Sequence, residues 1–168
     1  MIHSFFFFLC IDLIYIFNHP SLLMKKDKPN VLFVCSHNSA RSQMAETFLR
    51  DYGGDYFDVY SAGIEGTRIN PYTIKVLEEL NYDLSEQYAK SISDFLGNMK
   101  FDIVITVCSE AEKNCPTIPG VKTKLHWDIE NPSSFEGTEE EKIEVFRRVR
   151  DDIKAKVLEF LKERGIKV

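Results

Sequence analysis

The chain has 168 residues, of which 44% are hydrophobic and 28% are charged, and its formal net charge at pH 7 is −5. A chain of this length folds around one core that buries roughly 70% of its unfolded surface, and its composition excludes a disordered or collagen-like protein. The acidic balance argues against a broad electrostatic surface for nucleic acid or anionic lipid. Four cysteines are too few for a disulfide-stapled mini-domain and favour reactive thiols in a reducing compartment, so we expect a cytoplasmic protein. We also expect a monomer.

The first 24 residues differ in character from the rest of the chain. Between Phe5 and Phe17 the only charged residue is Asp12. The run is short for a membrane helix, which needs about 20 apolar residues, and it lacks the basic start and small-residue cleavage site of a secretory signal. Three interpretations stay open: an artefact of start-site assignment with Met24 as the true start, a membrane-associating or targeting segment, and an extra helix packed on the domain.

From residue 25 onward, strand and helix patterns alternate. In chain order they predict a strand at 31–34, a helix over 45–52, a strand at 57–62, a helix from Pro71 to Leu80, a helical turn at 93–96, strands at 101–107 and 125–127, a loop at 129–137 and a helix from Thr138 to Gly165. The continuous apolar runs are typical of buried parallel strands, and Thr138-x-x-Glu141 is a capping box. The alternation predicts a single α/β domain with a four-stranded parallel sheet, helices on both faces, and a ligand site beyond the carboxyl ends of the strands.

A Cys-x5-Arg-Ser sequence lies where the first strand ends and its helix begins. Such a loop can direct successive backbone N–H groups at one point, and the helix N-terminus adds positive charge, which together suit a tetrahedral oxyanion. The predicted oxyanion-binding residues are Ser36, His37, Asn38, Ser39, Ala40 and Arg41. The same positive field favours Cys35 as a thiolate nucleophile, with Ser42 as its hydrogen-bond donor. The alternative is a buried cysteine beside a capping serine and a solvated arginine.

These residues lead to a family resemblance. Val31–Cys35, Asn38–Glu46 and Ser61–Gly63 resemble the low-molecular-weight protein tyrosine phosphatase superfamily. Within that superfamily, Val107-Cys108-Ser109, Asn114-Cys115-Pro116 and His126-Trp127 resemble the thioredoxin-coupled arsenate reductase branch rather than plain phosphatases. The resemblance extends from Asn30 to about Gly165. It implies a phosphatase-like fold and an arsenical-detoxifying enzyme that converts arsenate to arsenite.

Two further cysteines follow the third predicted strand. Cys108 ends this strand and can reach Cys35 at the same sheet edge, and Cys115 lies in a Pro-containing segment that can rearrange. Reduction of As(V) to As(III) takes two electrons, which two thiols supply by forming a disulfide. We therefore interpret Cys35 as the nucleophile, Cys108 as the thiol that releases arsenite, and Cys115 as the thiol that captures Cys108 in a disulfide for thioredoxin to reduce. The alternatives are small apolar fillers or a zinc pair, although their spacing is wide for zinc.

Asn131-Pro132 departs from the family pattern, which has Asp-Pro with the aspartate as general acid. Asparagine cannot transfer a proton, which leaves Glu130 and Asp128 as the nearby carboxylates that can substitute. Ser133-Ser134 also lacks the aromatic residues expected to bind phosphotyrosine. Both departures weaken the alternative, a phosphatase acting on phosphotyrosine or a small phosphate ester. A non-enzymatic oxyanion-binding module is the third hypothesis.

The resemblance also implies a potassium site. The matching positions are Asn38, Glu46, Ser61 and Asp94, and their oxygen donors suit a hard cation, although the same residues are equally typical of loop caps and surface charge. His37 stands where the family often has glycine, and we expect it to be an exposed loop residue. We expect His126 and Trp127 to be strand and packing residues rather than catalytic ones.

Overall fold

The computed structural model describes residues 27–167, so the three interpretations of residues 1–24 lie outside the described residues. The elements are β1 (Asn30–Cys35), α2 (Arg41–Gly53), β2 (Asp58–Gly63), α3 (Pro71–Glu78), the 3-10 turn η2 (Ile92–Asp94), β3 (Ile103–Thr106), α4 (Ser109–Asn114), β4 (Thr123–His126), the 3-10 turn η3 (Pro132–Ser134) and α5 (Glu139–Glu163). Within this part of the chain, no helix is long and apolar enough to cross a membrane.

The four strands form one parallel sheet in the order β2-β1-β3-β4, which confirms the predicted architecture. Strand β1 is central, and Val34 near its carboxyl end pairs with Ala62 of β2 on one side and Thr106 of β3 on the other. The chain therefore changes direction across the sheet between β1 and β3. In open parallel sheets, ligands bind in the crevice at such a switch point.

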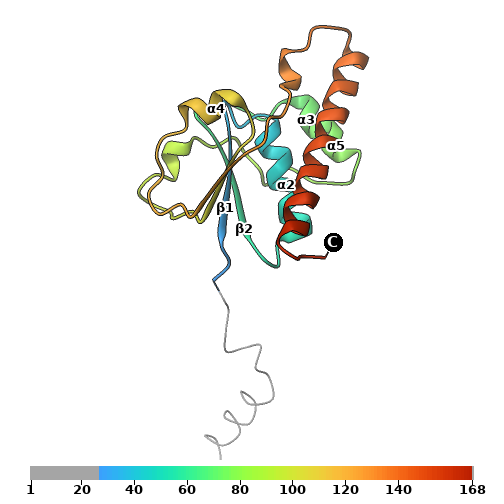
Figure 1. Ribbon diagram of the computed structural model, residues 1–168. Coiled ribbons are helices and arrows are strands. Elements are labelled where there is room, and N and C mark those ends of the chain that lie inside the picture. Colours follow the sequence, from blue (N-terminus) through green and yellow to red (C-terminus); the bar gives the residue numbers. More distant parts are fainter. Residues whose placement is uncertain (1–26, 168) are drawn as a thin grey trace, which may run out of the picture.

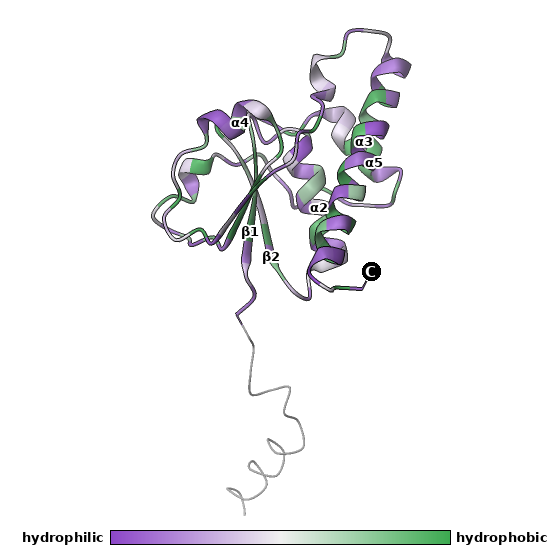
Figure 2. Cartoon of the chain, in the orientation of Figure 1, coloured by the Kyte–Doolittle hydropathy of each residue, from purple (hydrophilic) through white to green (hydrophobic). Residues whose placement is uncertain are grey.

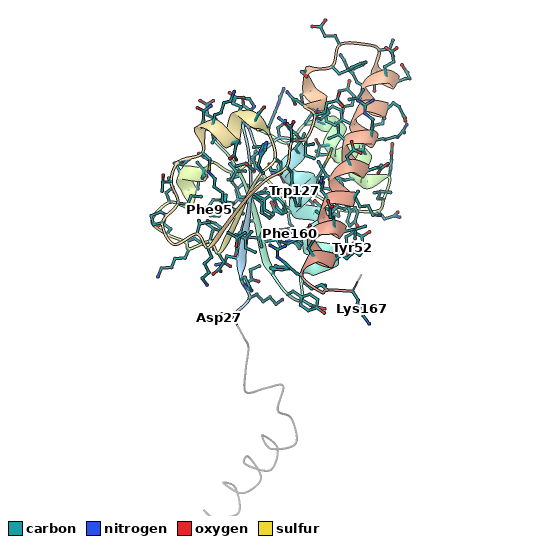
Figure 3. The ribbon with its side chains drawn as sticks, viewed as in Figure 1. Asp27, Tyr52, Phe95, Trp127, Phe160 and Lys167 are labelled. Atoms are coloured by element: carbon teal, nitrogen blue, oxygen red, sulfur yellow. The ribbon has the colours of Figure 1, made fainter. Side chains whose placement is uncertain are left out.

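Helices cover both faces of the sheet, as predicted. Figure 1 shows α2, α3 and α5 on one side, and α4 with the η2 segment on the other. The first side holds most of the aromatic core, in which Trp127 packs between Phe33 and Phe160 with ring centroids 5.5 and 6.2 Å away. Figure 3 labels Trp127 and Phe160 on this side and Phe95 on the other. Helix α5 begins at the predicted capping box, where the Thr138 hydroxyl accepts from the Glu141 N–H at 3.2 Å.

Helix α4 was not predicted. Only Ala111 of its six residues is buried, so it carries no apolar repeat for the sequence to show. Figure 2 shows most of β1 in apolar green and α4 mainly in hydrophilic purple. The helix therefore lies on the sheet with little apolar packing, and it occupies the segment between Cys108 and Cys115.

Candidate active site

Cys35 is the last residue of β1, and its side chain faces the loop that leads into α2. The Asn38 N–H donates to Cys35 Sγ at 3.1 Å, and the Ser42 hydroxyl lies 2.9 Å from the same sulfur. Cys35 is only 3% exposed. A thiolate accepts hydrogen bonds without donating any, so both contacts suit the ionised nucleophile that the sequence predicts.

The N-terminus of α2 is open to an anion. Its capping residue, Ala40, offers no side-chain hydrogen bond, and the first turn holds no acidic residue. The first N–H groups of the helix and its positive dipole end therefore remain available to a ligand. Arg41 begins the helix, and its Nη1 donates to the Ile129 carbonyl oxygen at 3.1 Å, which holds the guanidinium beside the opening.

A cavity of about 260 Å³ lies over this loop. Its lining residues are Cys35, His37, Ser39, Ala40, Arg41, Thr67, Asn70, Asn131 and Ser133. None of these lining residues carries a carboxylate, so a bound oxyanion meets no negative side chain among them. The predicted oxyanion loop is thus brought together around one cavity, except that the side chains of Ser36 and Asn38 turn away from it.

Asn38 holds the loop in shape. It is fully buried with φ +51°, and its Nδ2 donates to Ser42 Oγ at 2.9 Å and to Ser61 Oγ at 2.8 Å. Its Oδ1 accepts from Gln43 Nε2 at 2.9 Å and from the Lys90 N–H at 2.8 Å. Four hydrogen bonds on one buried amide fix the loop before substrate arrives. Sequence reasoning missed Gln43 and Lys90 because their role depends on where the chain returns to the loop.

Gly63 allows the loop to lie against the end of β2. A Cβ at this position would lie 2.4 Å from the Glu65 carbonyl oxygen and 2.7 Å from the Asn38 nitrogen. Any side chain would push the backbone of the loop away from the sheet. The close approach explains why the Ser61-Ala62-Gly63 stretch accompanies the cysteine loop.

Three of the four predicted potassium ligands lie together, and the fourth does not. Ser61 hydrogen-bonds both Asn38 and the buried Glu46 carboxylate. Asp94 makes no hydrogen bond to the other three: its Oδ2 accepts from the Ser91 N–H at 2.9 Å and caps the η2 turn. The reason is local, because a carboxylate three residues after a serine completes a capping box.

Two cationic side chains already compensate the Glu46 charge. Arg50 pairs with one carboxylate oxygen, and Lys90 Nζ lies 3.4 Å from the other with its side chain only 11% exposed. A potassium ion would have to displace the Lys90 ammonium from a buried position. The residues present therefore do not fit a potassium ion.

The protein should not depend on potassium for stability. Replacing potassium chloride with choline chloride at equal ionic strength is expected to change the free energy of unfolding by less than about 0.5 kcal/mol, because exposed charges are screened equally by both salts. Urea titration of the full-length protein measures this difference. Specific stabilisation that saturates with potassium concentration would show that an ion does bind.

Cys108 lies beside the cysteine loop. It is 4% exposed and caps α4, with its Sγ accepting from the Ala111 N–H at 3.3 Å. The Ser36 hydroxyl lies 3.5 Å from Cys108 Sγ and donates to Glu110 Oε2 at 2.8 Å. Since Ser36 directly follows Cys35, the structure brings the second thiol to the loop that carries the first, as the shared sheet edge predicts.

Cys115 lies at the other end of α4. Its N–H donates to the Ala111 carbonyl oxygen at 2.8 Å and ends the helix, and its half-buried side chain lines a second cavity of about 260 Å³. Seven residues of helix rise about 10 Å, whereas the Cα atoms of a disulfide lie roughly 4.4–6.8 Å apart. A disulfide between Cys108 and Cys115 therefore requires α4 to unwind. In the described residues, no three His, Cys, Asp or Glu side chains group as metal ligands.

Burial raises the pKa of the Cys115 thiol; the Lys124 ammonium opposes this rise, and the Glu112 carboxylate adds to it. A raised pKa keeps the group protonated to higher pH, so its alkylation by iodoacetamide should keep accelerating past about pH 8.5, the ordinary range of a free thiol. Peptide mapping of the reduced protein after timed alkylation at several pH values measures the rate at this cysteine alone. A rate that levels off below pH 8 would contradict the burial argument.

The two carboxylates proposed as substitute acids do not reach the cavity, so this prediction is corrected. Glu130 pairs with Arg148 at 2.7 Å, and both Glu130 and Asp128 line a separate groove against α5. Asn131 lines the cavity instead. The backbone turns at this position, so residues adjacent in sequence face opposite sides.

Thr67, Asn70 and Ser133 line the cavity without having been predicted. Asn70 Oδ1 accepts from the Tyr72 N–H at 2.8 Å, and its Nδ2 donates to Ser133 Oγ at 3.3 Å. The Asn-Pro pair is a recognisable helix start, so the sequence could have revealed the cap. It could not have revealed that the cap lies at the cavity.

The chain is similar to several arsenate reductases. An arsenate reductase of Halalkalibacterium halodurans is 45% identical over 134 residues, which cover 80% of this chain and 96% of the relative. An arsenate reductase of Bacillus subtilis is 44% identical over a match that covers 77% of this chain and 93% of the relative. A solved arsenate reductase in the oxidized state superposes with a TM-score of 0.66 at 33% identity, over 80% and 97% of the two chains. The thioredoxin-dependent arsenate reductase of Corynebacterium glutamicum superposes with a TM-score of 0.61 at 25% identity, and the match covers 92% of this chain and 71% of that one. Residues 30–167 match the family described as low molecular weight phosphotyrosine protein phosphatase, and the chain belongs to this family.

Proposed function

We propose that this protein is an arsenate reductase that uses three thiols in sequence and is re-reduced by thioredoxin. The observation that carries the proposal is the contact of Ser36, in the cysteine loop, with the buried thiol of Cys108. A phosphatase needs one cysteine at this loop, whereas a reductase needs a second thiol within reach of the first. The names of the relatives support the same activity.

In the first step the Cys35 thiolate attacks the arsenic atom of arsenate. A sulfur–arsenic bond forms, and one arsenate oxygen leaves as water after taking up protons, while arsenic stays in the +5 state. Arg41 and the open N-terminus of α2 bind the remaining oxygens. Ser42 and the Asn38 N–H stabilise the thiolate before attack.

In the second step the Cys108 thiolate attacks Cys35 Sγ. A disulfide forms between these cysteines, the sulfur–arsenic bond breaks, and its electron pair stays on arsenic, which leaves as arsenite in the +3 state. The two thiols are thereby oxidised by two electrons in balance with arsenic. Cys108 Sγ lies 3.5 Å from Ser36 Oγ, next to Cys35 in the loop, and the Ala111 N–H donates to this sulfur at 3.3 Å.

In the third step the Cys115 thiolate attacks Cys108 Sγ, and Cys35 leaves as a thiolate ready for the next arsenate. This exchange transfers the disulfide to the exposed end of α4 without further change in oxidation state. The helix must unwind for the two sulfurs to meet. A thioredoxin dithiol then reduces the Cys108–Cys115 disulfide, and the thioredoxin-dependent relative supports this class of donor.

Ester hydrolysis is less well supported by the site. An alkoxide leaving group needs a proton from a nearby acid, and no described residue lining the cavity carries a carboxylate. Asn131 occupies the position where the family pattern has an acid, and its Oδ1 accepts from the Ser133 N–H at 3.3 Å. Arsenate depends less on a protein acid, because the hydroxyl oxygen that leaves already carries a proton at neutral pH, whereas the oxygen of an ester carries none.

The proposal is tested without any electron donor. Fully reduced full-length protein is mixed with excess arsenate, and the arsenite released is counted. The relay predicts about one arsenite per chain and the loss of two thiols, with peptide mapping locating the disulfide at Cys108–Cys115. No arsenite from folded, fully reduced protein would refute it. Hydrolysis of p-nitrophenyl phosphate under the same conditions would instead favour the phosphatase alternative.

A further inference from the structure

Helix α4 has little intrinsic stability, although the proposed relay depends on when it unwinds. It has six residues and one buried side chain, Ala111, whereas isolated helices shorter than about 12–15 residues are marginal in water. Contacts with the rest of the protein must therefore hold it. At its start, these are the Cys108 cap and the hydrogen bond from Ser36 to Glu110.

The second half of α4 is held by Glu112. The fully buried Thr106 hydroxyl of β3 donates to Glu112 Oε2, and His126 Nδ1 of β4 lies 3.6 Å from the same oxygen. His126 Nδ1 is also 2.9 Å from Thr106 Oγ1. Because the Thr106 proton points to the carboxylate, His126 Nδ1 is the donor in this contact. The three side chains tie α4 to two strands of the sheet.

Glu112 can leave this contact without depriving a buried group of its hydrogen-bond partner. When Glu112 moves away, the Thr106 hydroxyl still has the Leu125 carbonyl oxygen at 3.4 Å, or His126 Nδ1 in its other tautomer, as acceptor. The freed carboxylate enters water, since its side chain is already 39% exposed. An unpaired buried hydroxyl would have made opening costly, so the contact resists unwinding without preventing it.

We propose that Glu112 is a positioning residue that latches α4 in its helical form through Thr106 and His126, and so sets the rate at which Cys115 captures Cys108. The inference rests on the proposed function and adds to it a control of the third step. In that step one sulfur–sulfur bond forms as another breaks, so the latch changes the rate and leaves the chemistry unaltered.

The test follows both disulfides in a single turnover. Reduced full-length protein is mixed with arsenate without thioredoxin, quenched with an alkylating agent at intervals, and mapped by mass spectrometry. Glu112→Ala is expected to speed the appearance of the Cys108–Cys115 disulfide about fivefold to tenfold and to leave arsenite release within about twofold. Since alanine favours helix more than glutamate does, faster unwinding cannot come from helix propensity.

Two further variants separate the latch from the effect of the Glu112 charge on Cys115. Thr106→Val keeps that charge and the His126 contact but removes the hydroxyl, so it should accelerate the third step by at most as much as Glu112→Ala, and the double variant should be no faster than Glu112→Ala alone. Glu112→Gln removes the charge but keeps an acceptor oxygen, so its rate for the third step should lie nearer that of the unchanged protein than that of Glu112→Ala. Lys113→Ala, on an exposed residue of the same helix, is the matched control.

Amide hydrogen exchange of the reduced protein provides a readout that needs no arsenate. The α4 amides should exchange about fivefold faster in Glu112→Ala and Thr106→Val than in Lys113→Ala. The latch is contradicted if Glu112→Ala leaves either the exchange rates of the α4 amides or the rate of the third step unchanged. If arsenate yields no disulfide at all, the proposed function fails, and oxidation by diamide then tests the latch separately. The latch predicts that Glu112→Ala forms the Cys108–Cys115 disulfide faster than the unchanged protein, and equal rates would contradict it.

Discussion

Replacing Cys108 with serine is expected to lower arsenate reduction at least about a thousandfold while leaving oxyanion binding within about twofold. Serine cannot attack the Cys35 sulfur, so the sulfur–arsenic bond persists and no electron pair reaches arsenic. Cys108 lies outside the lining of the cavity, and its buried side chain is nearly isosteric with serine. Arsenite release measures the first effect, and phosphate affinity by calorimetry measures the second.

Cys115→Ser is the matched control for that result. This variant keeps the first two thiols, so a single turnover without a donor should still release about one arsenite per chain and leave a Cys35–Cys108 disulfide. Repeated turnover with thioredoxin should then fail. If Cys108→Ser and Cys115→Ser both release arsenite at the rate of the unchanged protein, the order of the thiols proposed above is wrong.

Replacing Asn38 with alanine is expected to destabilise the protein by about 3 kcal/mol or more and to weaken phosphate binding at least about tenfold. The change removes the hydrogen-bond partner of four groups that are buried or nearly so: the side chains of Ser42, Ser61 and Gln43 and the N–H of Lys90. It also places alanine at a positive φ, which asparagine tolerates better because its side-chain amide forms local hydrogen bonds. Urea unfolding and phosphate calorimetry measure the two effects.

The control for this variant is Asn81→Ala. Asn81 also has a positive φ, +64°, but it is exposed. Its substitution should lower the free energy of unfolding by only about 1 kcal/mol, because only the backbone strain of alanine at positive φ contributes. The difference between the two variants then reports the buried hydrogen bonds of Asn38. Equal destabilisation would mean that the Asn38 side chain does not hold the loop.

The sheet and the long helix could be predicted because their signals are local. The continuous apolar run at 31–34 is typical of a buried strand, and Thr138-x-x-Glu141 indicates where α5 begins. The cysteine loop follows from the same logic. A Cys-x5-Arg sequence between such a strand and a helix has few conformations that satisfy its backbone groups.

The parts that sequence reasoning missed depend on contacts distant in the chain. Helix α4 has one buried residue and so no periodicity, and it is held by Thr106 and His126 from two strands. Asp94 completes a capping box with Ser91, a contact that sequence reasoning did not name. Lys90 reaches Glu46 across 44 residues of sequence, which no motif spacing reveals.

The most direct test of the account is NADPH oxidation by the full-length protein with thioredoxin, thioredoxin reductase and arsenate. The three-thiol relay predicts arsenate-dependent consumption of NADPH that saturates with arsenate and disappears in Cys108→Ser. The absence of consumption by folded protein, with coupling enzymes shown to be active on another disulfide, would contradict thioredoxin-linked arsenate reduction.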